Sequence, residues 1–466
     1  MVRVTVIPTA RPTFAVEAAR QRAAAARDLL AGLGADVRGP AGLVMTGQDV
    51  AAAAAFAGAA ADLVINVCAS FSDASGAIRL YRGLAQPVLL WAFREPGPVG
   101  DRLWLNSLCG ANLFGHAIVR AGGSVRLVYG DPDDPATRDT VAAALSGQLP
   151  AAGVTPHDPG RPRGAPGAAR HAVRALRGAV IGLIGDAPPG FTPCEYDPHL
   201  LGELFGISVR TRTTGEFFRR VREVGTAARD AERAAAQAAQ PTLRTVDPAQ
   251  VSLSAAVTVA LRDWVDREAL AAVAVRCWPE FPTLLGVCPC SALSRLADAG
   301  TPTACERDVY GAVTMLLLEA LGSGPTYLVD TVDLDTAANV IRLWHCGSAA
   351  TTLAADPARA AQSVHCNRRI GVAGNFPLRT GRVIMARLAE APGGGLRMLI
   401  AAGESLPEPN RFQGNTAAVR LDADAGEFVR GLVTGGFPHH TVLAWTDVRA
   451  GLRAAADQLG IPVCEW

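Results

Sequence analysis

Residues 2–68 decide the fold, because they set strands and helices in regular alternation. The chain begins Val2-Arg3-Val4-Thr5-Val6-Ile7-Pro8, an alternating apolar stretch typical of a strand. Residues 14–33 have the pattern of an amphipathic helix that stops at Gly34, and the apolar residues 62–68 predict the next strand. Strands separated by helices of this length pair in parallel, so the sequence predicts a doubly wound α/β fold.

The alternation changes twice along the chain, which predicts three domains. A stretch rich in Pro, Gly and Ala at 149–170 is the best linker, and a second doubly wound α/β unit follows it. After about residue 350, short strands separated by turn residues indicate an antiparallel, barrel-like β-rich part with no long helix before 447–459. The predicted domains are 1–160 (α/β), 171–350 (α/β, with the acids discussed below) and 351–466 (β-rich).

The composition excludes several classes of function. All 44 basic residues are arginine, because the chain contains no lysine. A lysine Schiff base cannot form, which excludes pyridoxal-phosphate enzymes and imine-forming aldolases, and a Walker-type phosphate loop would lack its lysine. The net charge of +1 gives no general attraction to nucleic acid or to an anionic membrane, so neither is expected as a partner.

The expected location is the cytoplasm. The N-terminus has no long apolar run behind a basic start, so we expect no export signal. The longest apolar stretch, 51–67, is mostly alanine and is interrupted by Asp62, so it is expected to be a helix that leads into a strand. The ten cysteines are expected as reduced thiols, and Cys288-Pro289-Cys290 lacks the spacing of a zinc ribbon.

The first chemical candidate is Glu306, in Thr303-Ala304-Cys305-Glu306-Arg307-Asp308-Val309-Tyr310-Gly311. With Thr303 as its N-cap, a helix is predicted over residues 305–321. Helical periodicity then places Glu306 on the apolar face and Asp308 on the other side. A buried carboxylate needs a neutralising partner, so Glu306 is predicted either to meet a cation or to form a buried pair with an arginine or cap the helix.

An acid and three histidines complete a candidate site. Asp330 ends an apolar run, and ligands of open α/β sheets lie beyond the carboxyl ends of the strands. His345 is the last residue of a predicted strand, 340–345, and lies on its apolar face. A histidine there is either a ligand or a buried core residue with its hydrogen bonds formed. The turn 435–441 precedes a strand and would place His439 and His440 at its mouth. The alternative is a turn that faces solvent. Acids and imidazoles together are an N/O donor set that suits Mn²⁺ or another divalent cation.

These residues resemble the L-fucose isomerase / L-arabinose isomerase superfamily. The resemblance is carried by 304–312, by Asp330 after its apolar strand, by His345-Cys346-Gly347 and by 435–441, with weaker support from Ala10-Arg11-Pro12-Thr13 and Leu89-Leu90-Trp91-Ala92. It implies an Mn²⁺-dependent enzyme that interconverts an aldose and a ketose through a cis-enediol. It also implies a small-molecule sugar as the substrate and a homo-oligomer.

Carried over residue by residue, the resemblance implies roles for seven side chains. Glu306 and Asp330 match the metal-binding acids that also act as the acid/base pair. The histidine ligand of the family matches the pair His439-His440, with His440 the better match, and His345 matches a ligand position of the arabinose branch. The implied substrate contacts are Arg11, Trp91, His345 and His439. An Asp as second acid is fucose-like, whereas His345 is arabinose-like, so the sugar stays open. The alternatives are another metal-dependent enzyme that acts on a modified sugar, and a non-catalytic sugar-binding protein.

Overall fold

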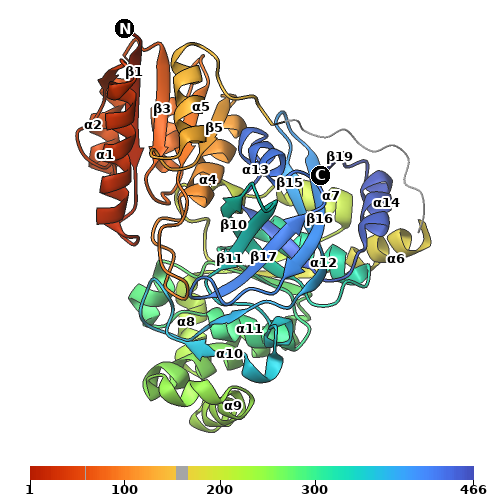
Figure 1. Cartoon of the computed structure of the whole chain (residues 1–466). Coiled ribbons are helices and arrows are strands. Elements are labelled where there is room, and N and C mark those ends of the chain that lie inside the picture. The colour runs from red at the N-terminus through yellow and green to blue at the C-terminus, as the bar shows by residue number, and fades with distance from the viewer. Residues whose placement is uncertain (58, 154–165) are drawn as a thin grey trace.

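The computed structural model describes residues 1–57, 59–153 and 166–466, and Figure 1 shows the chain. Two parallel sheets are followed by a mixed, mostly antiparallel sheet, so the predicted fold class is confirmed. Most of the predicted linker, residues 154–165, lies outside the described residues, and its last residues belong to α6 (Pro166–Leu176). None of the described helices is long and apolar enough to cross a membrane.

The first sheet is parallel, with strand order β2-β1-β3-β4-β5. Its strands are β1 (Arg3–Thr9), β2 (Asp36–Arg38), β3 (Leu63–Cys68), β4 (Val88–Ala92) and β5 (Val125–Tyr129), and its helices are α1 (Val16–Gly32), α2 (Gly47–Ala57), α3 (Ser75–Tyr81), α4 (Ser107–Arg120) and α5 (Pro135–Leu145). β3 and β4 are buried along their whole length, as expected of strands covered on both faces. The order reverses between β1 and β3, so the loops after these two strands flank a crevice suited to a ligand.

The second sheet is also parallel, with order β7-β6-β8-β9. Its strands are β6 (Val180–Ile184), β7 (Ser208–Arg212), β8 (Ala272–Val275) and β9 (Thr303–Cys305). The helices around it are α6, α7 (Pro198–Phe205), α8 (Thr214–Arg222), α9 (Thr226–Ala239), α10 (Pro248–Glu268), α11 (Cys290–Asp298) and α12 (Val309–Ala320).

The helix predicted over 305–321 begins later than expected, and Thr303 does not cap it. Pairing with β8 keeps the chain extended through Cys305. Glu306 and Arg307 then take left-handed φ values of 57° and 67°, and Asp308 is the N-cap of α12. Glu306 therefore projects from a tight strand-to-helix turn and not from the apolar face of a helix.

The third sheet contains a closed barrel. The eight strands of this sheet are β10 (Tyr327–Asp335), β11 (Val340–His345), β14 (Phe376–Pro377), β15 (Gly381–Glu390), β16 (Leu396–Leu406), β17 (Asn415–Leu421), β18 (His440–Ala444) and β19 (Val463–Glu465). Each of β17, β11, β10, β18, β15 and β16 pairs antiparallel with the next, and β16 pairs back with β17. The barrel thus takes its first two strands from the range of the second predicted domain.

Two expectations for this part are wrong. Asp330 does not end a parallel strand, because β10 continues to Asp335 and pairs antiparallel with β11 and β18. A helix, α13 (Ala425–Thr434), also precedes α14 (Arg449–Leu459), since residues 425–434 carry an apolar face that packs on α4. A short antiparallel pair, β12 (Gln362–Ser363) with β13 (Ala373–Gly374), flanks the loop 364–372. Figure 1 shows the barrel strands between the first domain and the helices of the second.

Candidate active site

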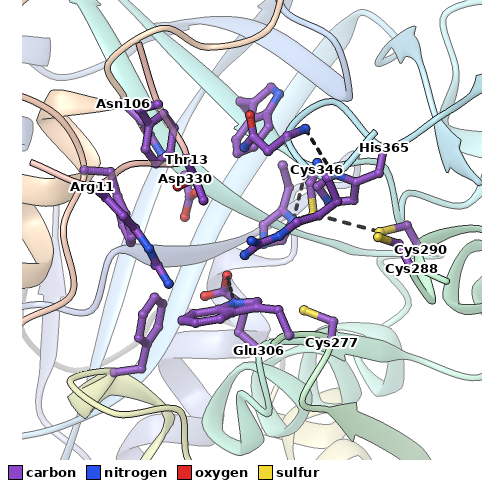
Figure 2. A pocket seen from close by; sticks show the side chains of 18 of the residues that line it. Arg11, Thr13, Asn106, Cys277, Cys288, Cys290, Glu306, Asp330, Cys346 and His365 are labelled. Carbon is purple, nitrogen blue, oxygen red and sulfur yellow. Dashed lines mark hydrogen bonds between the residues drawn. The ribbon is translucent and has the colours of Figure 1, made fainter. Parts of the chain in front are cut away.

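A pocket lies where the three parts of the chain meet, with about 730 Å³ of empty space when the solvent at its mouth is included. The first domain contributes Arg11, the second Trp278 and Glu306, and the C-terminal part His345 and His439, together with neighbouring side chains. Figure 2 shows Arg11 reaching in from one side and Glu306 and Asp330 facing the same space. The crevice between β1 and β3 therefore opens onto the carboxylates.

Both acids lie close to the imidazole of His440. Glu306 Oε2 lies 3.4 Å from His440 Nε2 and 3.5 Å from His439 Nε2. His440 Nε2 lies 3.6 Å from Asp330 Oδ1, and these two residues are direct partners in the β10–β18 register. Within the described part of the chain, Glu306 Oε2, Asp330 Oδ1 and His440 Nε2 are buried and have no hydrogen-bond partner. Buried polar atoms are normally paired, so these three atoms, with both acids close to His440 Nε2, suit a divalent cation. Glu306, His439 and His440 offer ligand atoms that all lie within 4.8 Å of one another.

Asp308 fixes the orientation of His440. Its Oδ2 accepts a hydrogen bond from His440 Nδ1 over 2.8 Å, so in the neutral ring the lone pair of Nε2 faces Glu306 and Asp330. The Asp308 carboxylate is fully buried and forms an ion pair with the equally buried Arg387. Burial alone would raise the pKa of Asp308, but Arg387 and His440 hold it well below its usual value. Burial would lower the pKa of His440, yet Asp308 and the other acids raise it.

His345 is held in the opposite tautomer. Its Nδ1 accepts the backbone N–H of Cys346 over 2.9 Å, so in the neutral ring Nε2 carries the hydrogen. Burial lowers the pKa of His345, which favours that neutral form. His345 lines the pocket and its ring lies 5.4 Å from that of His440. It therefore offers a hydrogen-bond donor, whereas His440 offers a lone pair.

Glu306 stays ionised despite its burial. Trp278 Nε1 donates a hydrogen bond of 3.1 Å to Glu306 Oε1. Burial works to raise the pKa of Glu306, but the nearby imidazoles of His439, His440 and His345 bring it to about 2. A negative charge at this point would favour a cation, and Oε2 has no hydrogen-bond partner among the described residues.

Six of the seven predicted site residues come together, and Trp91 does not. Arg11, Glu306, Asp330, His345 and His439 line the pocket, and His440 lies directly behind them. Trp91 is buried inside β4, where its Nε1 donates to the carbonyl of Gly130 over 2.9 Å. Its position in an apolar parallel strand explains this burial, since both faces of the first sheet are covered.

Sequence reasoning missed four side chains of the site: Trp278, Asp308, Arg368 and Arg387. Asp308 lies two residues after Glu306, but the helix predicted over 305–321 placed it on the face opposite to Glu306. Once the helix begins at Val309, the same spacing makes Asp308 its cap, facing Gly311 N at 2.8 Å. No local signal identifies Arg387, because its partner lies 79 residues away.

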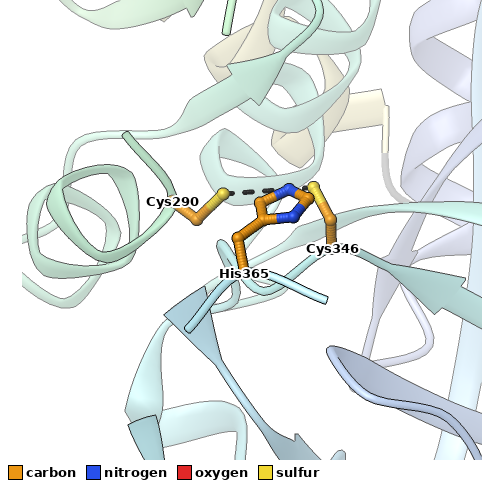
Figure 3. Close-up of side chains that lie close together, drawn as sticks. All are labelled: Cys290, Cys346 and His365. Atoms are coloured by element: carbon orange, nitrogen blue, oxygen red, sulfur yellow. Dashed lines mark hydrogen bonds between the residues drawn. The ribbon is translucent and has the colours of Figure 1, made fainter. Parts of the chain in front are cut away.

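One wall of the pocket carries thiols beside a histidine, Cys290, Cys346 and His365 (Figure 3). The Cys290 and Cys346 sulfurs lie 4.0 Å apart, and all ten cysteines are free. His365 Nδ1 accepts the backbone N–H groups of Asn367 and Arg368 at 3.2 and 3.3 Å. Its Nε2 therefore carries a hydrogen, so this wall presents thiols and an N–H donor and does not match a three-ligand metal site.

Comparison with known proteins gives one consistent result over the whole chain, although no family model matches it. A sulfoquinovose isomerase of Alkalicoccus urumqiensis is 30% identical over 100% of this chain and 99% of its own length. A sulfoquinovose isomerase of Clostridium sp. (strain MSTE9) is 31% identical over 98% and 97%. A third, from Priestia megaterium, is 29% identical over 95% and 94%.

Proposed function

Because the chain belongs to the sulfoquinovose isomerase family and is an aldose–ketose isomerase, we propose that it converts sulfoquinovose, a sulfonated aldose, to the corresponding ketose. The choice of sulfoquinovose as the substrate is supported by the relatives, which are named sulfoquinovose isomerases. The chemistry rests on one observation, the convergence of Glu306 Oε2, Asp330 Oδ1 and His440 Nε2 as buried atoms without partners in the described chain. A modified sugar was one of the alternatives that the mixed ligand pattern left open.

We propose Mn²⁺ or a similar divalent cation as the resident metal. Two carboxylates and one imidazole, with the second imidazole of His439 beside them, match the N/O preference of such an ion. Asp308 behind His440 provides the carboxylate–histidine arrangement that orients metal-binding imidazoles. When bound, the cation would supply positive charge near the sugar oxygens, where negative charge develops during the reaction.

The two carboxylates are proposed to move the protons. One removes the proton from C2 of the open-chain aldose, and the C–H electron pair becomes the C1=C2 bond of a cis-enediol while the carbonyl oxygen O1 takes a proton from the other acid. The first carboxylate then returns its proton to C1, and the O2 hydroxyl gives its proton back to the other acid as the new carbonyl forms. The N–H of His345 is available to a sugar oxygen. Phe191 packs edge-on to Trp278 at 4.9 Å and helps to exclude water.

The variant Glu306→Gln tests this proposal. It removes the charge of an acid/base group and cation ligand while keeping its shape, so we expect a loss of at least about 10²–10⁴-fold in the conversion of sulfoquinovose measured by NMR with Mn²⁺. Glu203→Gln, an exposed change on α7, is the matched control and should keep full activity. An unchanged rate in Glu306→Gln, or wild-type activity that survives complete chelation, would contradict the proposal.

Isotope exchange separates the proton-transfer route from its competitors. In D₂O, transfer through an enediol should place solvent deuterium at C1 of the ketose and, on reversal, at C2 of the aldose. A direct hydride shift would leave both carbons unlabelled. A protein that only binds the sugar would give neither product nor exchange.

A further inference from the structure

Two arginines, Arg11 and Arg368, bring positive charge into the same pocket. The guanidinium carbon of Arg11 lies 4.4 Å from the centre of the Trp278 ring, and that of Arg368 lies 5.8 Å from it. Both side chains line the pocket. In the described chain their backbone N–H groups donate hydrogen bonds, Arg11 to Ser70 and Arg368 to His365, but neither guanidinium forms a hydrogen bond or a salt bridge.

This arrangement is unfavourable without a further anion. Burial lowers the pKa of Arg11, and the charge of Arg368 lowers it further, whereas Asp73 and Glu306 act against this shift from a distance. Many other arginines of the chain form close ion pairs, as Arg387 does with Asp308. Two like charges held together in a partly buried pocket indicate that a negative group belongs between them.

Both arginines are held by structured loops. His365 closes the loop between β12 and β13: its Nδ1 accepts the N–H of Arg368, its carbonyl accepts the N–H of Arg369 at 2.9 Å, and its own N–H donates to Ile370. Arg11 follows β1, and its N–H is fixed by Ser70 Oγ at 3.0 Å. The backbone from which each arginine extends is therefore fixed, which reduces the entropy lost on binding an anion.

Trp278 contacts both the cationic and the acidic groups of the pocket. Its Nε1 donates to Glu306, while the two guanidinium groups lie against its ring. A hexose with C1 and C2 at the carboxylates would extend along the indole and place its far end near the arginines. Guanidinium groups match oxyanions that have several equivalent oxygens, because their N–H donors form a planar fork.

We propose that Arg11 and Arg368 form the subsite that binds the sulfonate of the substrate and selects sulfonated over neutral sugars. This inference rests on the proposed function, because it assumes a sugar bound with its reactive end at Glu306 and Asp330. His365 is a positioning residue, since it acts on Arg368 through the backbone of its loop.

Calorimetric binding to the metal-free full chain tests the subsite without turnover. Sulfoquinovose should bind wild type, and D-glucose should bind at least about tenfold more weakly. Arg368→Gln and Arg11→Gln should each weaken sulfoquinovose binding by about 10- to 100-fold, the range for a lost charge-assisted hydrogen bond, and Arg368→Lys should restore part of it. Arg138→Gln, an exposed change on α5, should have no effect. Equal binding of the two sugars, or unchanged binding in both glutamine variants, would overturn the proposal.

Turnover with Mn²⁺ distinguishes the two proposals from each other. Arg368→Gln should raise the KM for sulfoquinovose by a similar factor, with a much smaller change in kcat. Wild type that binds sulfoquinovose through the arginines but converts no sugar would remove the proposed substrate and leave the anion subsite. Wild type that isomerises glucose and sulfoquinovose with equal kcat/KM would remove the subsite and leave the isomerase.

Discussion

At the scale of single residues, Asp308 has three roles. It caps α12, it pairs with Arg387 and it holds His440 through Nδ1. All these contacts are buried, so the carboxylate has no water to replace a lost partner. The orientation of a proposed metal ligand therefore depends on a charge pair that is also part of the core.

Arg387→Met should destabilise the protein strongly. It leaves the buried Asp308 charge without its guanidinium partner, a loss that typically costs about 3–5 kcal/mol of unfolding free energy. Arg382→Met, also on β15, is the control, because the Arg382–Asp422 pair is 39% and 44% exposed and should contribute less than about 1 kcal/mol. Urea denaturation measures both. Similar losses in the two variants would show that the buried pair has no special weight.

His440 and His345 should differ in what they bind. His440→Gln removes the lone pair that faces Glu306 and Asp330, so affinity for Mn²⁺ should fall by at least about 10–100-fold. His345→Gln removes a donor whose Nδ1 is already occupied, so metal affinity should change little while kcat/KM falls. Metal titration followed by calorimetry measures the affinities. A large loss of Mn²⁺ in His345→Gln would contradict the tautomer assigned to that ring.

At the scale of elements, local patterns predicted most strands and helices but not their assembly. Residues 2–8 and 62–68 have clear local signals, and the structure has β1 and β3 there, whereas the short strand β2 was not predicted. The start of α12 was wrong because pairing of β9 with β8 overrides helical periodicity around Glu306. The partners of Asp330 also escaped prediction, because closure of the barrel joins β10 to β18, more than a hundred residues later.

The buried Glu95 carboxylate at the start of α4 should make the free energy of unfolding depend on pH. The Glu95 carboxylate accepts the backbone N–H groups of Trp104 at 2.9 Å and Leu105 at 3.1 Å, and also that of Asn106, just before α4. Burial nevertheless raises the pKa of Glu95 from 4.5 to about 7. Because the folded state holds this proton more tightly than the unfolded chain, the stabilisation is complete below about pH 4.5 and is lost as the pH rises through about 7.

Glu95→Gln should remove this pH dependence. Between pH 4.5 and 8 the unfolding free energy of wild type should fall by on the order of 3 kcal/mol more than that of the variant. Urea titrations at several pH values measure both proteins, and the other titrating groups contribute to each of them alike. Parallel curves for the two proteins would show that Glu95 titrates near its ordinary value when folded.

At the scale of the whole molecule, the site exists only where three parts meet. Arg11 comes from the first domain, Glu306 from the second sheet, and Asp330 with His440 from the barrel. Helix α4 of the first domain packs on β10 and α13, which fixes the first domain against the barrel. Correct packing of α4 therefore matters for the chemistry as well as for stability.

Gly115→Ala should weaken this packing. A methyl group at Gly115 in α4 would collide with the backbone carbonyl of Val433 in α13, and such overpacking typically costs about 1–3 kcal/mol. Gly202→Ala, the same change in α7, meets nothing and should be neutral or slightly stabilising. Thermal unfolding and kcat/KM measure both variants. A Gly115→Ala protein as stable and active as Gly202→Ala would exclude a tight fit between the two helices.

The closed barrel has a consequence for how such an enzyme can change over evolution. Asp330 and His440 are cross-strand partners in a ring of strands that has no free edge, so neither strand can slide without breaking the ring. The arginines near Trp278 come instead from loops after β1 and between β12 and β13. Loops tolerate substitution and insertion far better than barrel strands do. New sugars could therefore be recruited by exchanging loop residues while the proposed proton-transfer centre is inherited unchanged.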